Sequence, residues 1–313
     1  MNEIKITIFT PTYNRAYTLP ILYQSLKRQT DKNFIWFIID DGSIDNTEEL
    51  LRQWQKEYAG FNIIYKKVSN GGKPRAINYA LQFINTRYIF ILDSDDYLTN
   101  DAVEFLNKHI SHIEKERRII GIGVLRGNNT LKAKHIPKIN KGNFVDATNL
   151  ERSIYNLDHD ANELYETAIL KQFPFETWKD EKFVPEAVSL NKIALAGYKL
   201  RWYNKVLVIS NYLDDGMTKG SWSLIKNNPM GYAIAFNESL LYPNMTFKDK
   251  IYSIIQFIVL TFISKNICFL LKSHKPLLTI LLLPIGIIWS LRRYYQLKQY
   301  DKYDKSINNR AHL

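Results

Sequence analysis

The chain has 313 residues and a formal net charge of +11, from 42 Lys and Arg against 31 Asp and Glu. Hydrophobic residues make up 46% of it, enough to bury a sizeable core, which excludes a globally disordered chain. The single cysteine, Cys268, excludes a disulfide framework and a cysteine-based zinc site.

The positive balance predicts an anionic partner: nucleic acid, a nucleotide or a lipid surface. Much of the positive charge gathers around apolar segments near the C-terminus, and no nucleic-acid recognition motif occurs, so nucleic acid is not the expected partner. The first residues run straight into a strand-like segment, without a stretch apolar enough for a signal peptide. We therefore expect the main body of the chain to be cytoplasmic.

The first 125 residues alternate short apolar runs with amphipathic segments. The apolar runs suit strands that are buried on both faces of a parallel sheet, and each amphipathic segment is long enough for a crossover helix. This alternation predicts an open α/β sheet with right-handed crossovers. The expected strands are 6–10, 34–39, 61–65, 88–92 and 119–124, and the expected helices are 17–29, 46–58, 73–85 and 100–116.

Residues 126–240 are less regular and richer in Asn, Lys and aromatic residues. Helical patterns predict helices at 148–156, 160–172 and 184–196, the last ending at Gly197. Because no repeat or low-complexity linker interrupts this region, we expect one domain over 1–240 whose two halves meet near residue 125.

Residues 247–313 change character. The segment 251–271 is largely apolar with a polar stripe, and 276–291 is almost wholly apolar. As a helix the second segment is about 24 Å long, short of the ~30 Å hydrocarbon core, and Pro284 is expected to break or kink it. Cations flank both segments, a pattern typical of helices that lie in the interface of an anionic membrane leaflet. A core helix pair of a soluble protein and a two-span hairpin are the alternatives.

Polar and acidic residues follow four of the expected strands. In open α/β sheets, ligands bind beyond the carboxyl ends of the strands, so these residues gather at the edge where a site is expected. The four stretches read Pro11-Thr12-Tyr13-Asn14-Arg15, Asp40-Asp41-Gly42-Ser43, Ser69-Asn70-Gly71-Gly72-Lys73 and Asp93-Ser94-Asp95-Asp96.

Asp93 and Asp95 are separated by one residue at a strand end, so their side chains are expected to point the same way. Two such carboxylates repel each other unless a cation or hydrogen-bond donors neutralise them. Mg²⁺ or Mn²⁺ suits this pair, because either ion takes one or two carboxylates and completes its shell with phosphate oxygens and water. The alternative is that these acids simply cap the next helix.

The other stretches offer groups for an anionic nucleotide. Asp41, in a tight turn, can accept a hydrogen bond from a base N–H, and Lys73 follows exposed amides that suit a phosphate. Arg15 supplies a fork-shaped donor for a diphosphate, and Tyr13 a face for stacking. Each motif also has a purely structural alternative: Asp41 could simply form an Asp-Gly turn, Lys73 could be a solvated lysine in a loop, and Tyr13 could pack on the surface.

Together these four motifs resemble family 2 glycosyltransferases, in which they occur in the same order and at about the same spacing. The resemblance implies a nucleotide-diphospho-sugar transferase fold of the GT-A type and an inverting reaction. It implies that 1–125 bind the nucleotide sugar and that 126–240 bind the acceptor. The residue pattern of 247–313 separately predicts a membrane-associating tail.

Carried over position by position, the resemblance implies that the first two motifs hold the nucleoside and that Lys73 lies near the base or diphosphate. Asp93 would face the ribose, and Asp95 would bind Mn²⁺ or Mg²⁺. Asp96 extends the motif, so the choice of metal ligand stays open. The nucleotide-sugar site would comprise Pro11, Thr12, Tyr13, Arg15, Asp41, Lys73, Asp93 and Ser94.

The family's catalytic base usually lies in a later Glu-Asp motif that opens a helix, and this chain departs from that pattern. Pro185-Glu186 stands in the matching place, so Glu186 is the candidate base, with Asp180 and Glu181 as competitors. Glu186 could instead be no more than a favourable helix start. Trp178 and Asp180 are candidates for acceptor contacts, although Trp178 could equally belong to a core.

The stretch 212–218 is similar to the part of these enzymes that closes over the donor phosphates, or is an ordinary turn. The resemblance implies a UDP-sugar as donor and a lipid-linked saccharide as acceptor, in bacterial capsule, exopolysaccharide or O-antigen assembly. An acceptor held in the leaflet would require the enzyme at the cytoplasmic face of the cell membrane, as a peripheral or monotopic protein. The alternative is a catalytically inactive membrane-bound scaffold, and the presence of Asp93, Asp95 and Glu186 argues against it.

Overall fold

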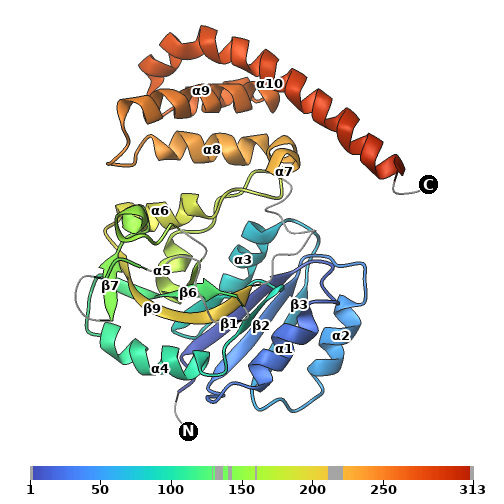
Figure 1. The fold of residues 1–313 in the computed structure, drawn as a ribbon, viewed down its shortest axis with the longest axis vertical. Coiled ribbons are helices and arrows are strands. Elements are labelled where there is room, and N and C mark those ends of the chain that lie inside the picture. Colours follow the sequence, from blue (N-terminus) through green and yellow to red (C-terminus); the bar gives the residue numbers. More distant parts are fainter. Residues whose placement is uncertain are drawn as a thin grey trace. The chain divides into compact units, whose positions relative to one another are not determined.

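The computed structural model describes residues 3–128, 130, 137–139, 143–158, 161–210 and 221–310. The chain divides into two compact units (Figure 1). The sheet unit comprises Met1–Phe175 and Ser189–Leu213, and the helical unit comprises Glu176–Val188 and Asp214–Leu313. The functional division of the chain into 1–240 and 247–313 stays a prediction.

The five strands and four helices expected in the first 125 residues are confirmed, each within a few residues of its predicted ends. The first four strands of the sheet lie parallel to one another, in the spatial order β3-β2-β1-β4. The elements are β1 (Ile6–Thr12), α1 (Leu19–Lys27), β2 (Phe34–Asp40), α2 (Thr47–Trp54), β3 (Asn62–Lys67), α3 (Lys73–Leu81), β4 (Tyr88–Ile91), α4 (Ala102–Ile113) and β6 (Ile119–Gly127).

The second half of the sheet is mixed rather than parallel. β8 (Ala161–Glu166) lies antiparallel between β4 and β6, so the helix predicted over 160–172 is wrong except for α5 (Thr167–Gln172). The helix prediction failed because β8 carries polar residues that are paired in the structure: Asn162 bonds Arg126, and Glu163 pairs with Arg152. The remaining elements are β5 (Asp96–Leu98), β7 (Phe144–Ala147), β9 (Lys199–Ser210), the 3₁₀ helix η1 (Asn149–Tyr155) and α6 (Ala187–Leu195).

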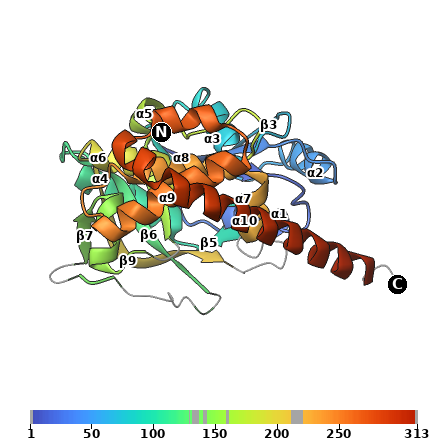
Figure 2. The same ribbon diagram turned by 90° about the horizontal axis from the view of Figure 1, so that it is seen from above.

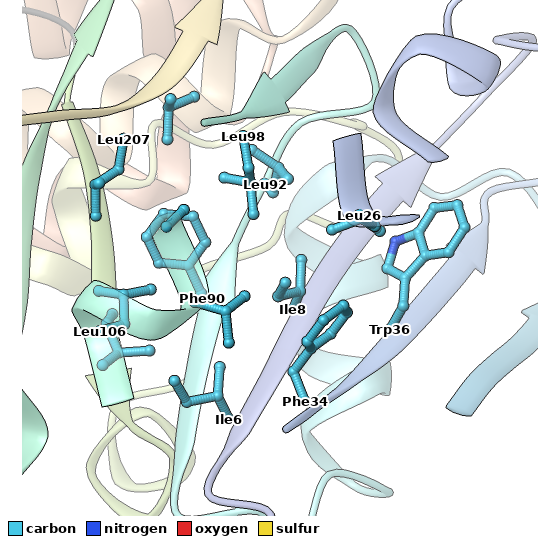
Figure 3. Close-up of a cluster of buried hydrophobic side chains, with 14 of the residues drawn as sticks. Ile6, Ile8, Leu26, Phe34, Trp36, Phe90, Leu92, Leu98, Leu106 and Leu207 are labelled. Carbon is cyan, nitrogen blue, oxygen red and sulfur yellow. The ribbon is translucent and has the colours of Figure 1, made fainter. Parts of the chain in front are cut away.

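Two hydrophobic layers enclose the sheet. Side chains alternate along a strand, so Ile6 and Ile8 of β1 face one layer with Phe90 of β4, while Phe9 faces the other. Figure 3 shows the first layer, in which Leu26 of α1 and other helix residues cover these strands. Both faces of β1, β2 and β4 are therefore buried, as their largely apolar sequences predict, whereas β3 is mostly part-exposed.

The helical unit is built from stacked helices. α9 (Phe247–Ile263) lies between α8 (Pro229–Ser239) and α10 (Pro276–Arg310), with α7 (Ser221–Asn227) and the 3₁₀ helix η3 (Ile267–Lys272) beside them (Figure 1). The polar stripe expected on α9 faces inward, because Ser253 bonds Ser239 of α8 and Gln256 accepts from Arg293 of α10. α9 is therefore the buried layer of this stack.

α10 is the exposed layer, and Figure 2 follows it as one helix to near the C-terminus. Pro284 does not break it, so of the two effects expected of this proline the break is wrong. A proline removes one helical hydrogen bond, while packing of Leu282 and Gly286 against α9 holds the helix on both sides. A Cβ on Gly286 would lie 2.4 Å from Ile258, so this glycine permits the close approach of the two helices. Within the described residues, one helix, Pro276–Gln299, is long and apolar enough to cross a membrane.

Candidate active site

The loops after β2 and β3 are joined by Asp41. Its two carboxylate oxygens accept from the backbone N–H groups of Gly71, at 2.7 Å, and Gly72, at 2.8 Å. The loops touch so closely that a Cβ on Gly42 would lie 2.9 Å from the backbone nitrogen of Asn70. Gly42 also has a φ of +81°, which disfavours other residues, so the Asp-Gly pair is required by this junction.

The loop after β1 is tied to the same junction. The Asn14 backbone N–H donates to Ser43 Oγ at 2.8 Å, and its side-chain oxygen accepts from Ile44 N–H at 2.9 Å. Arg15 N–H donates to Thr47 Oγ1 at 3.1 Å. Tyr13, just before this anchor, leaves 45% of its surface exposed. The first three predicted motifs are thus brought together at one edge of the sheet.

The acidic motif after β4 joins this edge through Lys73. Lys73 Nζ lies 2.6 Å from Asp93 Oδ1, and Arg126 of β6 lies 3.0 Å from Asp96 Oδ2 and 3.9 Å from Asp93 Oδ2. Burial would raise the pKa of Asp93, but Lys73 and Arg126 outweigh it and hold that pKa below its ordinary value. Burial raises the pKa of Asp96 to about 7, against the opposing effect of Arg126.

Arg126 was not singled out from the sequence, although a signal was present. It lies near the carboxyl end of the predicted strand 119–124, so the rule that selected the other strand ends applies to it as well. Its guanidinium is oriented by Nε, which donates to Asn162 Oδ1 at 3.1 Å, while Asn162 in turn donates to the carbonyl of Ile91.

Several acceptor atoms at this edge have no partner among the described residues. Thr12 Oγ1 and Asn70 Oδ1 are buried without a hydrogen bond, and the Asp95 carboxylate has neither a hydrogen bond nor an ion pair there. A buried polar atom without a partner is costly, so such atoms at a strand end mark a place where a ligand would be stabilised. Pro11 and Ser94, also predicted here, are buried beside them.

The carboxylates at this edge suit a divalent cation that takes one or two of them as ligands and completes its shell with oxygen atoms of a bound ligand. Among the described residues there is no group of three or more His, Cys, Asp or Glu side chains that could hold a metal by themselves. Asp95 is partly exposed and unpaired, whereas Asp93 and Asp96 already lie beside cations. Mg²⁺ and Mn²⁺ commonly use few protein carboxylates together with phosphate oxygens, so Asp95 is suited to that role.

The other predicted residues belong to the helical unit. Glu186 is half-buried and directly precedes α6, as expected. Asp180 is exposed, and Glu181 is 8% exposed, with its carboxylate accepting from the N–H groups of Met230 and Gly231. Burial raises the pKa of Glu181.

Trp178 packs edge-on against Phe269, with ring centroids 5.3 Å apart, in the apolar cluster around α8. The stretch 212–218 falls outside the described residues.

A mixed α/β sheet of this topology, with an acidic loop after its fourth strand, is typical of the GT-A fold of glycosyltransferases. Residues 7–173, more than half of the chain, match the family model "Glycosyl transferase family 2". The chain belongs to this family, which confirms the resemblance.

The curated relatives include enzymes that act on poly(ribitol-phosphate). The N-acetylglucosaminyltransferase TarP of Staphylococcus aureus is 32% identical over 176 residues, covering 54% of this chain and 48% of TarP. TarS of the same species is 26% identical over 215 residues, covering 64% of this chain and 35% of TarS. The poly(ribitol-phosphate) beta-glucosyltransferase of Bacillus spizizenii is 29% identical over 137 residues, 43% of this chain and 21% of that protein. The matched part of the chain thus spans about half or less of these relatives.

Solved structures share the fold. Residues 1–349 of S. aureus TarS, in complex with UDP-GlcNAc, superpose with a TM-score of 0.57 at 16% identity, covering 96% of this chain and 92% of that one. The mannosyltransferase PcManGT of Pyrobaculum calidifontis, in complex with GDP-Man and Mn²⁺, gives 0.55 at 14% identity, covering 97% and 88%. The GT-A fold predicted from the sequence is therefore confirmed.

Proposed function

We propose that this glycosyltransferase moves a sugar from a nucleotide-diphosphate donor, first of all a UDP-sugar, to a lipid-linked saccharide, with inversion. One observation carries the proposal. Four strand-end loops converge on one sheet edge and leave the buried Thr12 Oγ1 and Asn70 Oδ1 and the Asp95 carboxylate without partners among the described residues. TarS in complex with UDP-GlcNAc, a protein of the same fold, supports the choice of donor.

The nucleotide would lie along this edge. Pro11, Thr12 and Tyr13 would contact the nucleoside, with the exposed ring of Tyr13 available to stack on the base. Arg15 and Lys73 are the cations beside these loops that suit a diphosphate. The remaining groups of the proposed site are Asp41, Asp93 and Ser94.

A bound Mn²⁺ or Mg²⁺, held by Asp95, would supply charge neutralisation for the departing nucleoside diphosphate. This chain's own cations act in the same direction. Lys73 already stands 2.6 Å from Asp93, so a phosphate arriving at this edge meets an ammonium group fixed in place. PcManGT, in complex with GDP-Man and Mn²⁺, supports a divalent ion in this fold.

Glu186 is the base that we propose for the acceptor hydroxyl. Its competitor Glu181 has both oxygens committed to the backbone of α8, which leaves it poorly suited to take a proton from a substrate. Asp180 is exposed and offers an acceptor contact instead, and stacking of a sugar on Trp178 stays a prediction. One in-line displacement would break the bond from the anomeric carbon to the diphosphate, form the bond to the acceptor oxygen and invert configuration.

The acceptor would be presented at a membrane, against which the outer face of α10 would lie. This face exposes large apolar side chains, among them Leu281 at 72% and Ile288 at 66%. Lys272 and Lys275 precede it, Arg292 and Arg293 follow it, and no acid occurs from 265 to 299. The almost wholly apolar part, 276–291, is about 24 Å long, although the helix as far as Gln299 is long enough to cross a membrane; the cations on both sides of the apolar part favour an in-plane position on an anionic leaflet.

Charge favours lipid over a second copy of this chain on α10. In an antiparallel pair, the lysines before α10 in one copy would meet the arginines of the other, and a parallel pair would place identical cations side by side. Anionic head groups would neutralise the cations on both sides of the apolar stretch 276–291. This would place the enzyme at the cytoplasmic face of the cell membrane, as a peripheral or monotopic protein. The poly(ribitol-phosphate) enzymes among the relatives support a role in surface polysaccharide synthesis.

Titration calorimetry tests the donor site. UDP and UDP-sugars are titrated with and without Mn²⁺ into the wild type, Asp95→Ala and the control Asp101→Ala, an acid paired with Lys205 instead. We expect metal-dependent binding that Asp95→Ala loses and the control keeps. If UDP, GDP, CMP and dTDP compounds all fail to bind the wild type, the inactive scaffold becomes the better account.

Vesicle flotation tests the membrane surface. The wild type should float with vesicles containing phosphatidylglycerol, but not with pure phosphatidylcholine, and high salt should weaken the binding. The double variant Leu281→Glu/Ile288→Glu should stay unbound, while Ile21→Glu, an exposed apolar residue of α1, should bind like the wild type. Resistance to alkaline carbonate extraction would instead indicate a spanning helix.

A further inference from the structure

The segment that carries Glu186 is fastened to the N-terminus of α8 by reciprocal hydrogen bonds. Glu181 accepts from Met230 N–H at 2.8 Å and from Gly231 N–H at 2.7 Å. In the other direction, Asn228 Oδ1 accepts from the N–H groups of Lys182 and Phe183, at 2.9 and 3.0 Å. Four hydrogen bonds therefore join the two pieces of backbone within four residues of chain on each side.

The sequence of α8 explains why these bonds form. The first amides of a helix have no acceptor within the helix, and Pro229 at the first position has no N–H to satisfy. The next two free amides, of Met230 and Gly231, meet the Glu181 carboxylate at the positive end of the helix dipole. Glu181 and Asn228 are both buried, so water is a poor substitute for either partner.

Packing holds the same junction. A Cβ on Gly231 would lie 2.0 Å from the carbonyl oxygen of Phe183, so the backbones touch at this glycine. Val184 and Val188 are buried in a cluster with Ile234 of α8. These valines flank Glu186 in the sequence, and Glu186 is itself half-buried. The candidate base is thus bracketed by anchored residues while part of its own side chain stays accessible.

We propose that Glu181 and Asn228 are positioning residues for the transfer reaction, which fix the Glu186 segment on α8. This inference rests on the proposed role of Glu186 as base. It assigns the base to the helical unit, which also presents α10, rather than to the sheet that carries the nucleotide edge. Two asparagines hold different segments: Asn228, just before α8, bonds the base segment, and Asn237 of α8 bonds the η3–α10 connection at Lys272 and His274.

The test uses slow hydrolysis of UDP-GlcNAc, in which water replaces the acceptor, its proton goes to the base and UDP leaves. Glu181→Gln keeps the size of the side chain but turns one acceptor into a donor that faces an N–H. We expect hydrolysis about 10- to 100-fold slower, since small misplacement of a catalytic group has effects of this order. The dissociation constant for UDP should stay within about twofold, because positioning of the base does not touch the donor site.

Matched asparagine variants keep the test independent of Glu181 folding defects. Asn228→Ala removes the acceptor for Lys182 and Phe183 and should slow hydrolysis, whereas Asn228→Asp keeps that oxygen but loses the donor to the Leu224 carbonyl, and should restore part of the rate. Asn237→Ala removes an equivalent buried clamp on the same helix and should leave the rate near that of the wild type. Equal slowing by Asn237→Ala and Asn228→Ala would overturn the inference, since it would indicate general loosening of the unit.

A double-mutant cycle separates positioning from simple destabilisation. If Glu181 acts through the base, Glu181→Gln should have no further effect on the residual rate of Glu186→Gln. The same fold-loss in both backgrounds would overturn the inference. A wild-type rate in Glu181→Gln, with Glu186→Gln inactive, would overturn the positioning role and leave the proposed function intact. A wild-type rate in Glu186→Gln would overturn the base assignment and the positioning role together.

Discussion

Replacing Asp41 with Asn separates two roles that the residue can have at the sheet edge. In the structure its carboxylate accepts from Gly71 N–H and Gly72 N–H, so it acts as a clamp between two loops. The motif also implies a contact with the nucleoside. Asn keeps one acceptor oxygen and presents an NH₂ group in place of the other, so one of the two glycine amides loses its acceptor and faces a donor.

The expected loss of stability follows from burial and charge. Asp41 is buried, and a hydrogen bond to a charged acceptor contributes about 1.5–3 kcal/mol, to which the unsatisfied amide adds a further penalty. We therefore expect Asp41→Asn to lower the free energy of unfolding by about 2–4 kcal/mol. For a folding unit of about 200 residues this corresponds to a Tm lower by about 5–15 °C.

Thermal unfolding and UDP titration, run together, distinguish the roles. The control Ser43→Ala removes a single uncharged acceptor from the same loop, the one for Asn14 N–H, and should lower the free energy of unfolding by about 1 kcal/mol. If Asp41 clamps the loops, the variant should lose stability and also bind UDP about tenfold more weakly, because Asn70 and the following glycines shift. Loss of UDP binding with an unchanged Tm would refute the clamp and indicate a direct contact only.

Three further changes follow from packing, ionisation and charge. Gly286→Val should lower the free energy of unfolding of the helical stack by about 1–3 kcal/mol in thermal melts, because a Cβ there meets Ile258, and unchanged stability would contradict the close packing. Burial raises the pKa of Tyr23 to about 12, so the folded state holds this proton more tightly than the unfolded state does. About 3 kcal/mol of stability should therefore be present below pH 10 and lost as the pH rises toward 12, and Tyr23→Phe should lose less stability than the wild type in the same alkaline titration, in which Tyr88 still titrates with a raised pKa. Arg126→Ala leaves Asp96, which is 2% exposed, without its guanidinium partner, and because the pKa of Asp96 is already about 7, denaturant unfolding should report a larger loss of stability at pH 9 than at pH 6, whereas an equal loss at both would refute the pairing.

The parallel half of the sheet could be predicted because its signals are local. β1, β2 and β4 are largely apolar runs, and each polar stretch begins within two residues of the end of its own strand. Burial on both faces then leaves no other place for these runs. The convergence of Asp41 and Lys73 at one edge follows directly from parallel pairing, since all carboxyl ends meet there.

The antiparallel half could not be predicted in the same way, because its strands are defined by partners distant in the chain. The sequence of β8 by itself predicts a helix. Its polar residues have partners elsewhere in the chain: Asn162 bonds Arg126, which lies 36 residues earlier, and Glu163 pairs with Arg152. The anchoring of the base segment is equally remote, since Glu181 meets amides 49 and 50 residues later. Spacing along one chain does not encode such pairings.

The C-terminal helices show how an amphipathic pattern can be read with the wrong face outward. A polar stripe on α9 suggests a side turned to water, yet Gln256 and Ser253 bond neighbouring helices inside the stack. Their hydrogen bonds are satisfied internally, while Leu281 and Ile288 of α10 point outward. Burying polar groups and exposing large aliphatic ones is unfavourable for a helix stack surrounded by water. At a lipid interface the same arrangement is favourable, because the outward aliphatic groups enter the acyl boundary and no polar group needs to follow them.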